Sequence, residues 1–252
     1  MTETLLGTPR APGDLIRALR ATKLCAALPA SALQRLAAAA TRTTAHRGDM
    51  LWRAGDEATR LFAVSTGFVK LTRQDPVEGE VLVALFGPGE SVADAVVLAG
   101  GTHPASASVQ SARATLLEVR ADRFLEVVRT EPLAGVAMGR AILDHVERLH
   151  AKIAIMAAGD VERRLAVALS RLAERHGKTD ERGATFLPAS LTRAEMASFI
   201  GARVETTTRV IARWQREKLI GTSAQGLLVV DGARLRRIAE SRDDAHATRS
   251  PR

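Results

Sequence analysis

The order of apolar and polar residues divides the chain into three kinds of segment. Residues 14–21 and 30–40 carry apolar side chains at helical spacing and predict two short helices. From about residue 43 to residue 120, short apolar runs alternate with Gly-containing turns, which indicates strands. Helical spacing returns from residue 132 onward. We therefore expect short helices, then a set of strands, and then a mainly helical C-terminal half.

The middle segment is predicted to form an antiparallel roll or sandwich. Turn signals such as His46-Arg47-Gly48-Asp49 and Gly87-Pro88-Gly89 separate its apolar runs. Many short strands at this spacing are typical of all-β architectures whose neighbouring strands are antiparallel. The expected strands are residues 50–52, 61–64, 68–72, 81–86, 107–110 and 115–119.

A long helix is predicted from Leu133 to Met156, after a short one over residues 122–128. Its apolar stripe steps by four, three, four and three residues, which is coiled-coil spacing. An amphipathic helix packed on its own domain would show a similar stripe, so the spacing alone leaves both interpretations open. Asp160 is placed to cap the next helix, residues 161–176. The stripe consists of Ile142, Val146, Leu149, Ile153 and Met156.

The segment from Leu191 to Ile220 has the pattern of two helices joined by a tight turn. Thr192 and Glu195 form a capping-box pattern, and Gly201 suits a turn that needs positive φ. The second helix, residues 204–218, has an apolar back and a polar, Arg-rich front, as a DNA recognition helix does. The alternative is a helical hairpin with a solvated basic face. The back consists of Thr207, Val210, Ile211 and Trp214, and the front of Glu205, Thr208, Arg209, Ala212, Arg213 and Arg216.

Two short segments then predict a β-hairpin that would form a wing beside these helices. They are residues 221–223 and 226–231, and a last short helix is expected over residues 233–241. The formal net charge of +8 and the pI of about 10.8 suit a polyanionic partner. Aromatic residues make up only 3% and Tyr is absent, which argues against recognition of single strands by base stacking.

The single cysteine, Cys25, excludes an intrachain disulfide and a cysteine-ligated iron–sulfur cluster. Its apolar neighbours indicate a small buried hydrophobic residue. No apolar run is long enough to span a bilayer, and no signal-peptide pattern opens the chain, so we expect a cytoplasmic protein without a membrane partner.

These motifs together resemble the family of the cyclic-AMP receptor protein and the fumarate–nitrate reduction regulator (CRP/FNR). The β-roll resemblance is carried by residues 46–49, 52–56, 61–67 and 86–90, and the helix-turn-helix resemblance by residues 191–197 and 201–209. The resemblance implies an α+β fold in three parts and a non-enzymatic transcription regulator, with double-stranded DNA, a second copy and RNA polymerase as partners. The parts are a cyclic-nucleotide-binding-like antiparallel β-roll (14–130), a dimerisation helix (131–158) and a winged helix-turn-helix (159–241).

The same resemblance assigns roles in DNA binding residue by residue. Arg193 and Thr206 match phosphate contacts of the family, and Glu205 and Arg209 match the pair that reads bases. Arg can donate two hydrogen bonds to guanine, and a carboxylate can accept one from cytosine. The family's usual first arginine is Val204 here, so the expected target is closer to the TTGAT half-site of the second branch. The predicted DNA-binding set is Arg193, Arg203, Glu205, Thr206, Thr208, Arg209 and Arg213.

The effector pocket implied by the resemblance departs from the cyclic-nucleotide pattern. By position, the family's Gly-Glu pair becomes Ala93-Asp94, and its phosphate-binding Arg becomes Ala105, followed by Ser106. Without that Arg a buried cyclic phosphate would lack its charge partner, which argues against cyclic AMP. The cofactor stays open: haem with a diatomic gas, another small molecule, an atypical cyclic-nucleotide pocket and no ligand are the alternatives. The candidate haem ligands are Cys25, His46 and His103.

Two other classes of protein would use parts of the same pattern. A β-roll enzyme of the cupin type needs clustered His and Glu metal ligands, which the predicted strands lack. A signalling adaptor with a cyclic-nucleotide-like module would not need the 191–220 segment. The sequence therefore favours the DNA-binding regulator.

Overall fold

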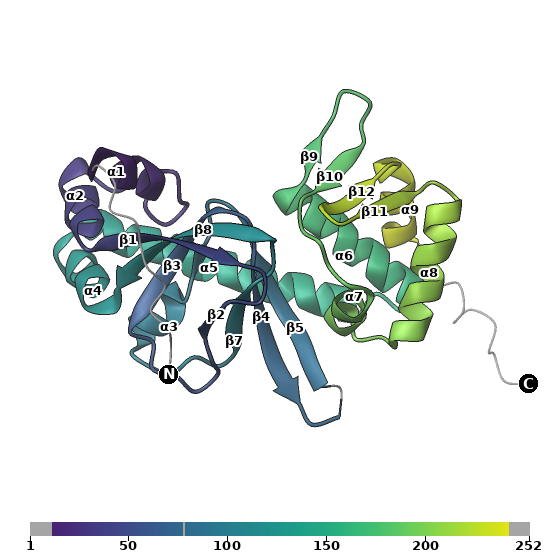
Figure 1. Ribbon diagram of the computed structural model, residues 1–252, viewed down its shortest axis with the longest axis horizontal. Helices are drawn as coiled ribbons and strands as arrows, with labels where there is room; N and C mark the ends of the chain where they lie inside the picture. Colours follow the sequence, from purple (N-terminus) through teal and green to yellow (C-terminus); the bar gives the residue numbers. More distant parts are fainter. Residues whose placement is uncertain (1–11, 78, 242–252) are drawn as a thin grey trace, which may run out of the picture. The chain divides into compact units, whose positions relative to one another are not determined.

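The computed structural model describes residues 12–77 and 79–241, which form two compact units divided between Arg148 and Leu149. The first unit contains most of the strands, and the second contains most of the C-terminal helices (Figure 1). Among the described residues, no helix is both long and apolar enough to cross a bilayer.

Two four-stranded antiparallel sheets form the β-roll of the first unit, with orders β1-β8-β3-β6 and β2-β7-β4-β5. Buried residues on their facing sides, among them Val64, Val69 and Leu116, make a core between the sheets. The strands are β1 (Ala40–His46), β2 (Met50–Trp52), β3 (Arg60–Thr66), β4 (Val69–Asp75), β5 (Gly79–Phe86), β6 (Ser91–Val92), β7 (Ser106–Val109) and β8 (Arg113–Arg120).

The outer face of the first sheet is covered by helices over part of its length. Leu61, Leu117 and Val119 on that face pack against buried leucines of the N-terminal helical segment and against Phe124 of α4. In Figure 1 these helices lie together beside β1. The helices of this unit are α1 (Pro12–Arg20), α2 (Ala30–Ala38), α3 (Asp94–Ala99) and α4 (Ala121–Thr130), and α5 (Pro132–Met156) begins in it.

In the second unit, helices α6, α7, α8 and α9 share a core that contains Trp214, and the unit also has a four-stranded sheet of order β11-β12-β10-β9. The Trp214 side chain is fully buried, and its Nε1 donates to Glu162 Oε1 at 2.9 Å. The elements are α6 (Val161–His176), β9 (Lys178–Thr179), β10 (Thr185–Leu187), α7 (Arg193–Ile200), α8 (Val204–Arg216), β11 (Ile220–Ser223), β12 (Gly226–Val229) and α9 (Gly232–Glu240).

The α+β class, the antiparallel roll, the long helix and the winged helix-turn-helix are as predicted, but several elements were not expected. The helix predicted to reach Ala40 ends at Ala38, and Ala40 already begins strand β1. The apolar pattern hides this strand because its buried positions include the polar Thr43, which is fully buried against the core. The other elements missing from the sequence analysis are β6, α3, β9 and β10.

Helix α5 is apolar on two sides. Ala134, Ala137 and Met138 are buried in the core of the first unit, and Ile155 is buried in the core of the second. The predicted stripe lies elsewhere on the helix, and all five of its side chains are 37% to 64% exposed. One face of α5 therefore packs on the chain itself, as one interpretation of the sequence has it, and the stripe is left exposed. The coiled-coil interpretation of the stripe stays a prediction.

Candidate DNA-binding interface and effector cavity

The turn between α7 and α8 is fixed by the residues that the sequence predicted. Thr192 Oγ1 accepts from the Glu195 backbone N–H at 3.1 Å, and Glu195 Oε2 accepts from the Thr192 N–H at 2.8 Å. This reciprocal capping box begins α7. Gly201 ends the helix with φ +61°, where any larger residue would also meet the Met156 side chain. The two helices are therefore set at a defined angle.

Helix α8 presents a polar front because its apolar back packs into the core, with Val210 partly buried there. Thr207, Ile211 and Trp214 are buried, and the Thr207 hydroxyl donates to the Arg203 carbonyl at 3.1 Å. The opposite side of the helix is exposed to solvent. It carries Glu205, Thr208, Arg209, Arg213 and Arg216.

The arginines on this front are not equally available. Arg209 is exposed, and its Nη2 lies 3.5 Å from the Thr206 hydroxyl. A hydrogen bond of this length is weak, so contact with a ligand could replace it at little cost in free energy. Arg213 instead forms a 2.5 Å ion pair with Glu162 of α6. The part of Arg213 in DNA binding stays a prediction, and the same holds for the exposed Arg203 at the N-cap of α8.

Arg193, predicted as a phosphate contact, is half-buried and lies within a polar chain across the domain. Its Nη2 donates to Gln215 Oε1 at 3.1 Å, and Gln215 Nε2 donates to the Thr222 hydroxyl of β11 at 2.6 Å. Burial lowers the pKa of the guanidinium. Sequence reasoning missed Gln215 and Thr222, because their relation to Arg193 depends on how α7, α8 and the wing pack together.

Lys152 of α5 is a second polar side chain that the sequence did not single out. Its ammonium donates to the Phe199 carbonyl in the last turn of α7 and lies 4.4 Å from the centre of the Phe199 ring. A cation at a helix C-terminus interacts favourably with the helix dipole. Burial nevertheless lowers the pKa of Lys152 to about 8. The lysine thus holds α7 against α5 at the expense of partial desolvation.

The pKa of Lys152 predicts a pH-dependent stability. Because the folded-state pKa lies below the ordinary value of 10.5, the unfolded state binds more protons between pH 8 and 10.5. The free energy of unfolding should therefore gain a positive contribution as the pH rises through this window. Lys152→Met should remove that contribution, and Lys178→Met, at an exposed position, should retain it. Urea titrations of all three proteins between pH 7.5 and 10 test this; parallel pH profiles would contradict it.

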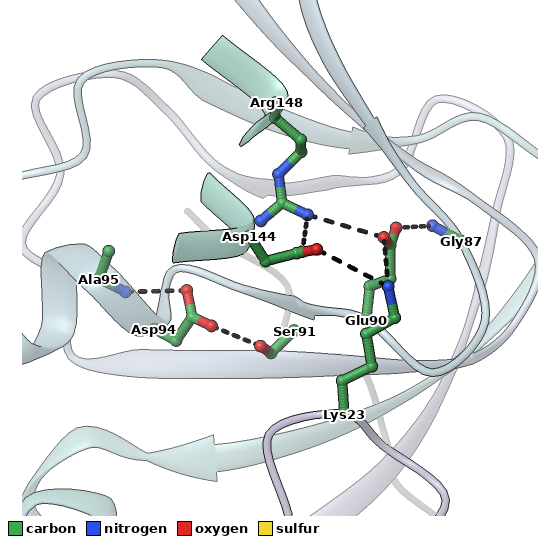
Figure 2. A network of polar contacts seen from close by, with 8 residues as sticks. All are labelled: Lys23, Gly87, Glu90, Ser91, Asp94, Ala95, Asp144 and Arg148. Atoms are coloured by element: carbon green, nitrogen blue, oxygen red, sulfur yellow. Dashed lines mark hydrogen bonds and ion pairs between the residues drawn. The ribbon is translucent and has the colours of Figure 1, made fainter. Parts of the chain in front are cut away.

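In the first unit, four charged residues meet beside a cavity of about 380 Å³ (Figure 2). Glu90 is only 3% exposed, and its carboxylate accepts from the Gly87 N–H at 2.8 Å. Lys23 and Arg148 lie 3.8 Å and 3.6 Å from Glu90 Oε1. Asp144 of α5 completes the cluster, 3.8 Å from Lys23 and 2.6 Å from Arg148. Two carboxylates and two cations thus join the N-terminal segment, the roll and α5.

The predicted effector residues divide between two places. Asp94 lines the cavity, where it accepts a 2.5 Å hydrogen bond from Ser91, and Ala93 before it adopts a left-handed φ of +73°. Ala105 and Ser106 lie at the start of β7 and are not among the residues that line this cavity. Their oxygens accept from Trp52 Nε1 and from the Ala54 N–H. The structure therefore brings only Asp94 to the cavity.

The three candidate haem ligands lie in different surroundings. Cys25 is buried in the core that includes the N-terminal helices, and burial raises the pKa of its thiol. His46 is exposed beside Asp49. His103 is buried, stacks on Trp52 with ring centres 4.2 Å apart, and has its pKa lowered by burial. A porphyrin needs ligands that face one apolar slot, so these residues do not fit a common haem site.

An antiparallel β-roll joined by a long helix to a winged helix-turn-helix is the architecture of a class of transcription regulators. Comparison with known proteins identifies the same two parts. Residues 42–131 match the model of the cyclic nucleotide-binding domain, and residues 163–238 match the Crp-like helix-turn-helix domain.

Similar proteins span most of the chain. The CRP-like cAMP-activated global transcriptional regulator of Mycobacterium tuberculosis is 28% identical over 198 residues, which are 77% of this chain and 85% of that protein. The fumarate and nitrate reduction regulatory protein of Vibrio cholerae is 24% identical over 77% of this chain and 76% of its own. The structure of FixK2 from Bradyrhizobium japonicum has the same fold, with a TM-score of 0.69, 14% identity, and coverage of 81% of this chain and 98% of that one. The chain belongs to the CRP/FNR family of transcription regulators.

Proposed function

We propose that the protein is a homodimeric regulator, not an enzyme, that binds a specific sequence in double-stranded DNA. The observation that carries this proposal is the exposed front of α8, where Glu205 and Arg209 lie one helical turn apart. The opposite side of the helix is packed into the core. Both side chains leave the same face, so they can reach adjacent base pairs in the major groove. Arg193, Arg203, Thr206, Thr208 and Arg213 are proposed to complete the contacts with DNA.

Dimerisation is proposed to occur through the exposed stripe of α5. A row of large apolar side chains at heptad spacing is unfavourable in water and suits a second, identical helix. A two-fold dimer also supplies the two recognition helices that a palindromic operator needs. We therefore propose residues 14–130 as the sensor, 131–158 as the dimerisation helix and 159–241 as the DNA-binding domain. RNA polymerase is the proposed partner at the promoter.

The effector is proposed to bind in or near the β-roll, in the cavity beside Glu90. Lys23, Asp144 and Arg148 line the same cavity. A polar ligand there would compete for the ion pairs that connect α5 to the roll, so its binding would bias the dimerisation helix. The charged lining favours a small polar molecule over a porphyrin.

Selection from random double-stranded DNA with the full-length protein tests the DNA-binding proposal. We expect enrichment of a palindrome with half-sites one helical turn apart, each containing a G·C pair that Arg209 contacts. A protein that enriches no sequence and binds only in proportion to DNA length would contradict the proposal. A single, non-repeated half-site would contradict the dimer.

Cyclic AMP should not bind measurably, because the phosphate-binding arginine of the family is absent at Ala105. Isothermal titration calorimetry at millimolar ligand should show no saturable heat. The protein should also bind its selected operator equally well with and without cyclic AMP. Micromolar affinity would contradict this expectation and would place the effector in an atypical cyclic-nucleotide pocket.

A further inference from the structure

A second hollow lies in the first unit, between the outer face of the sheet β1-β8-β3 and helix α1 with the residues that follow it. It has a volume of about 720 Å³ and is lined by Thr44, Thr115 and Thr66 from three adjacent strands. The register places Thr44 opposite Thr115, and Thr115 opposite Thr66. The three hydroxyl-bearing side chains therefore form one row across the sheet, which we call the threonine row.

A β-bulge adds a fourth hydroxyl. The pairing of β3 with β8 shifts between Val64 and Thr66, so Ser65 is the extra residue and lines the same groove as Thr66. Gly67 follows at φ +80°, and a side chain there would come within 2.6 Å of the Arg113 carbonyl. Gly67 thus fixes the bulge, because any other residue at this position would displace β8.

Arginines stand on both sides of the threonine row. Arg42 is two residues before Thr44 on β1, and Arg113 is two residues before Thr115 on β8, so both share the face of the row. Arg17 of α1 also lines the groove, and the one carboxylate in the lining is Asp14, 3.9 Å from Arg17. Three guanidinium groups against one carboxylate give the groove a positive charge.

The chain leaves hydrogen-bonding capacity in this groove unused. Arg42 Nε and Ser65 Oγ are buried and have no hydrogen-bond partner among the described residues. Arg42 makes one long contact, 3.4 Å from Nη2 to the Asp14 carbonyl. A small rotation of the Arg42 side chain would give up little and would direct its N–H groups toward a ligand oxygen.

We propose that this groove binds a phosphorylated sugar or polyol. Guanidinium groups bind phosphate by paired, charge-assisted hydrogen bonds, and a row of hydroxyls suits the hydroxyls of a carbohydrate. The lining contains no aromatic ring on which a nucleobase could stack, and its apolar members are Ala18, Ala21 and Val64. The volume lies within the range of small-molecule sites, roughly 300–1,000 Å³.

The groove is separate from the cavity beside Glu90, but the two adjoin through the backbone. Thr22 and Gly89 line the groove, and the residues that follow them, Lys23 and Glu90, line the cavity. The Lys23 N–H donates to the Gly89 carbonyl at 2.8 Å between the two sites. The proposed phosphate site rests on its own residues and does not depend on the DNA-binding proposal.

Calorimetric titration of the full-length protein with ribose 5-phosphate tests the site. We expect saturable binding of one ligand per chain and no saturable heat with ribose. Arg113→Gln should weaken binding about tenfold, as expected for loss of one charge-assisted pair, and Arg42→Gln with Arg113→Gln should abolish it. The exposed Arg73 of β4 provides the matched control, Arg73→Gln, which should bind like the unaltered protein.

Four results would overturn the proposal. They are no binding of ribose 5-phosphate, unaltered binding by the double variant, loss of binding in Arg73→Gln, and inorganic phosphate binding as tightly as the sugar phosphate. The last of these would show an anion site without carbohydrate recognition. Because Arg113 is exposed, its single variant should keep the fold, and circular dichroism with unaltered operator binding verifies this. Operator binding therefore separates failure of this site from failure of the proposed DNA-binding function.

Discussion

Replacing Leu149 and Ile153 with Asp should convert the protein into a folded monomer. The two side chains are 49% and 64% exposed on α5, so the substitutions remove no contact that the single chain needs. In the proposed dimer four such side chains are buried, each contributing about 1 kcal/mol or more, so the dissociation constant should rise roughly a thousandfold. The introduced carboxylates add repulsion across the two-fold axis. Analytical ultracentrifugation measures the result directly.

The monomeric double variant should also bind the operator more weakly, because a monomer contacts only one half-site. Arg171→Asp, at an exposed position of α6, introduces the same side chain away from the stripe and should remain dimeric. Ile153→Asp alone should give an intermediate dissociation constant. A double variant that sediments as the unaltered dimer would show that the stripe is not the interface, and unchanged circular dichroism verifies that the chains are folded.

Arg209→Ala should lower affinity for the selected operator by about 1–3 kcal/mol per half-site and relax the preference at one G·C pair. Arg209 is exposed on the front of α8, and its one described hydrogen bond, to Thr206, is long. Its guanidinium can therefore turn toward guanine O6 and N7 without disturbing the core. Binding titrations against the operator and its single-base variants, at two salt concentrations, measure both the loss and its dependence on sequence.

Arg193→Ala provides the contrasting result. A phosphate contact carries no sequence information, so this variant should bind all operator variants more weakly by the same factor and with a reduced salt dependence. Because Arg193 also donates to Gln215, the free energy of unfolding should fall as well, which Arg209→Ala should not cause. If Arg209→Ala lowers affinity equally for every operator variant, Arg209 does not read a base.

The helices of the C-terminal half could be predicted closely because their ends are encoded locally. Asp160 accepts from the Arg163 N–H, so the helix over residues 161–176 begins where the capping residue indicates. The capping box of Thr192 and Gly201 similarly fix both ends of α7. The exposed front of α8 followed from the same helical periodicity, so the proposed base-reading pair could be placed from sequence.

What the sequence did not reveal depends on contacts between distant segments. Strand β1 owes its place to pairing with β8, about seventy residues later, and its own apolar content is low. The cluster around Glu90 joins Lys23 to Arg148, and no local pattern marks such a set. Ala93 has a left-handed φ at the position where the resemblance implies Gly, but Ala93, Ala105 and Ser106 do not line the cavity that holds Asp94. Their part in effector binding stays a prediction.

The two tryptophans give each unit its own optical reporter. The chain has no Tyr and two Trp residues, so tryptophan dominates its near-ultraviolet fluorescence. Trp52 is buried in the first unit with its indole N–H bonded to Ala105, and Trp214 is buried in the second with its N–H bonded to Glu162. A Trp52→Phe protein emits tryptophan fluorescence only from the second unit, and a Trp214→Phe protein only from the first. Comparing their denaturation curves therefore reveals whether the units unfold as one cooperative block or in separate steps.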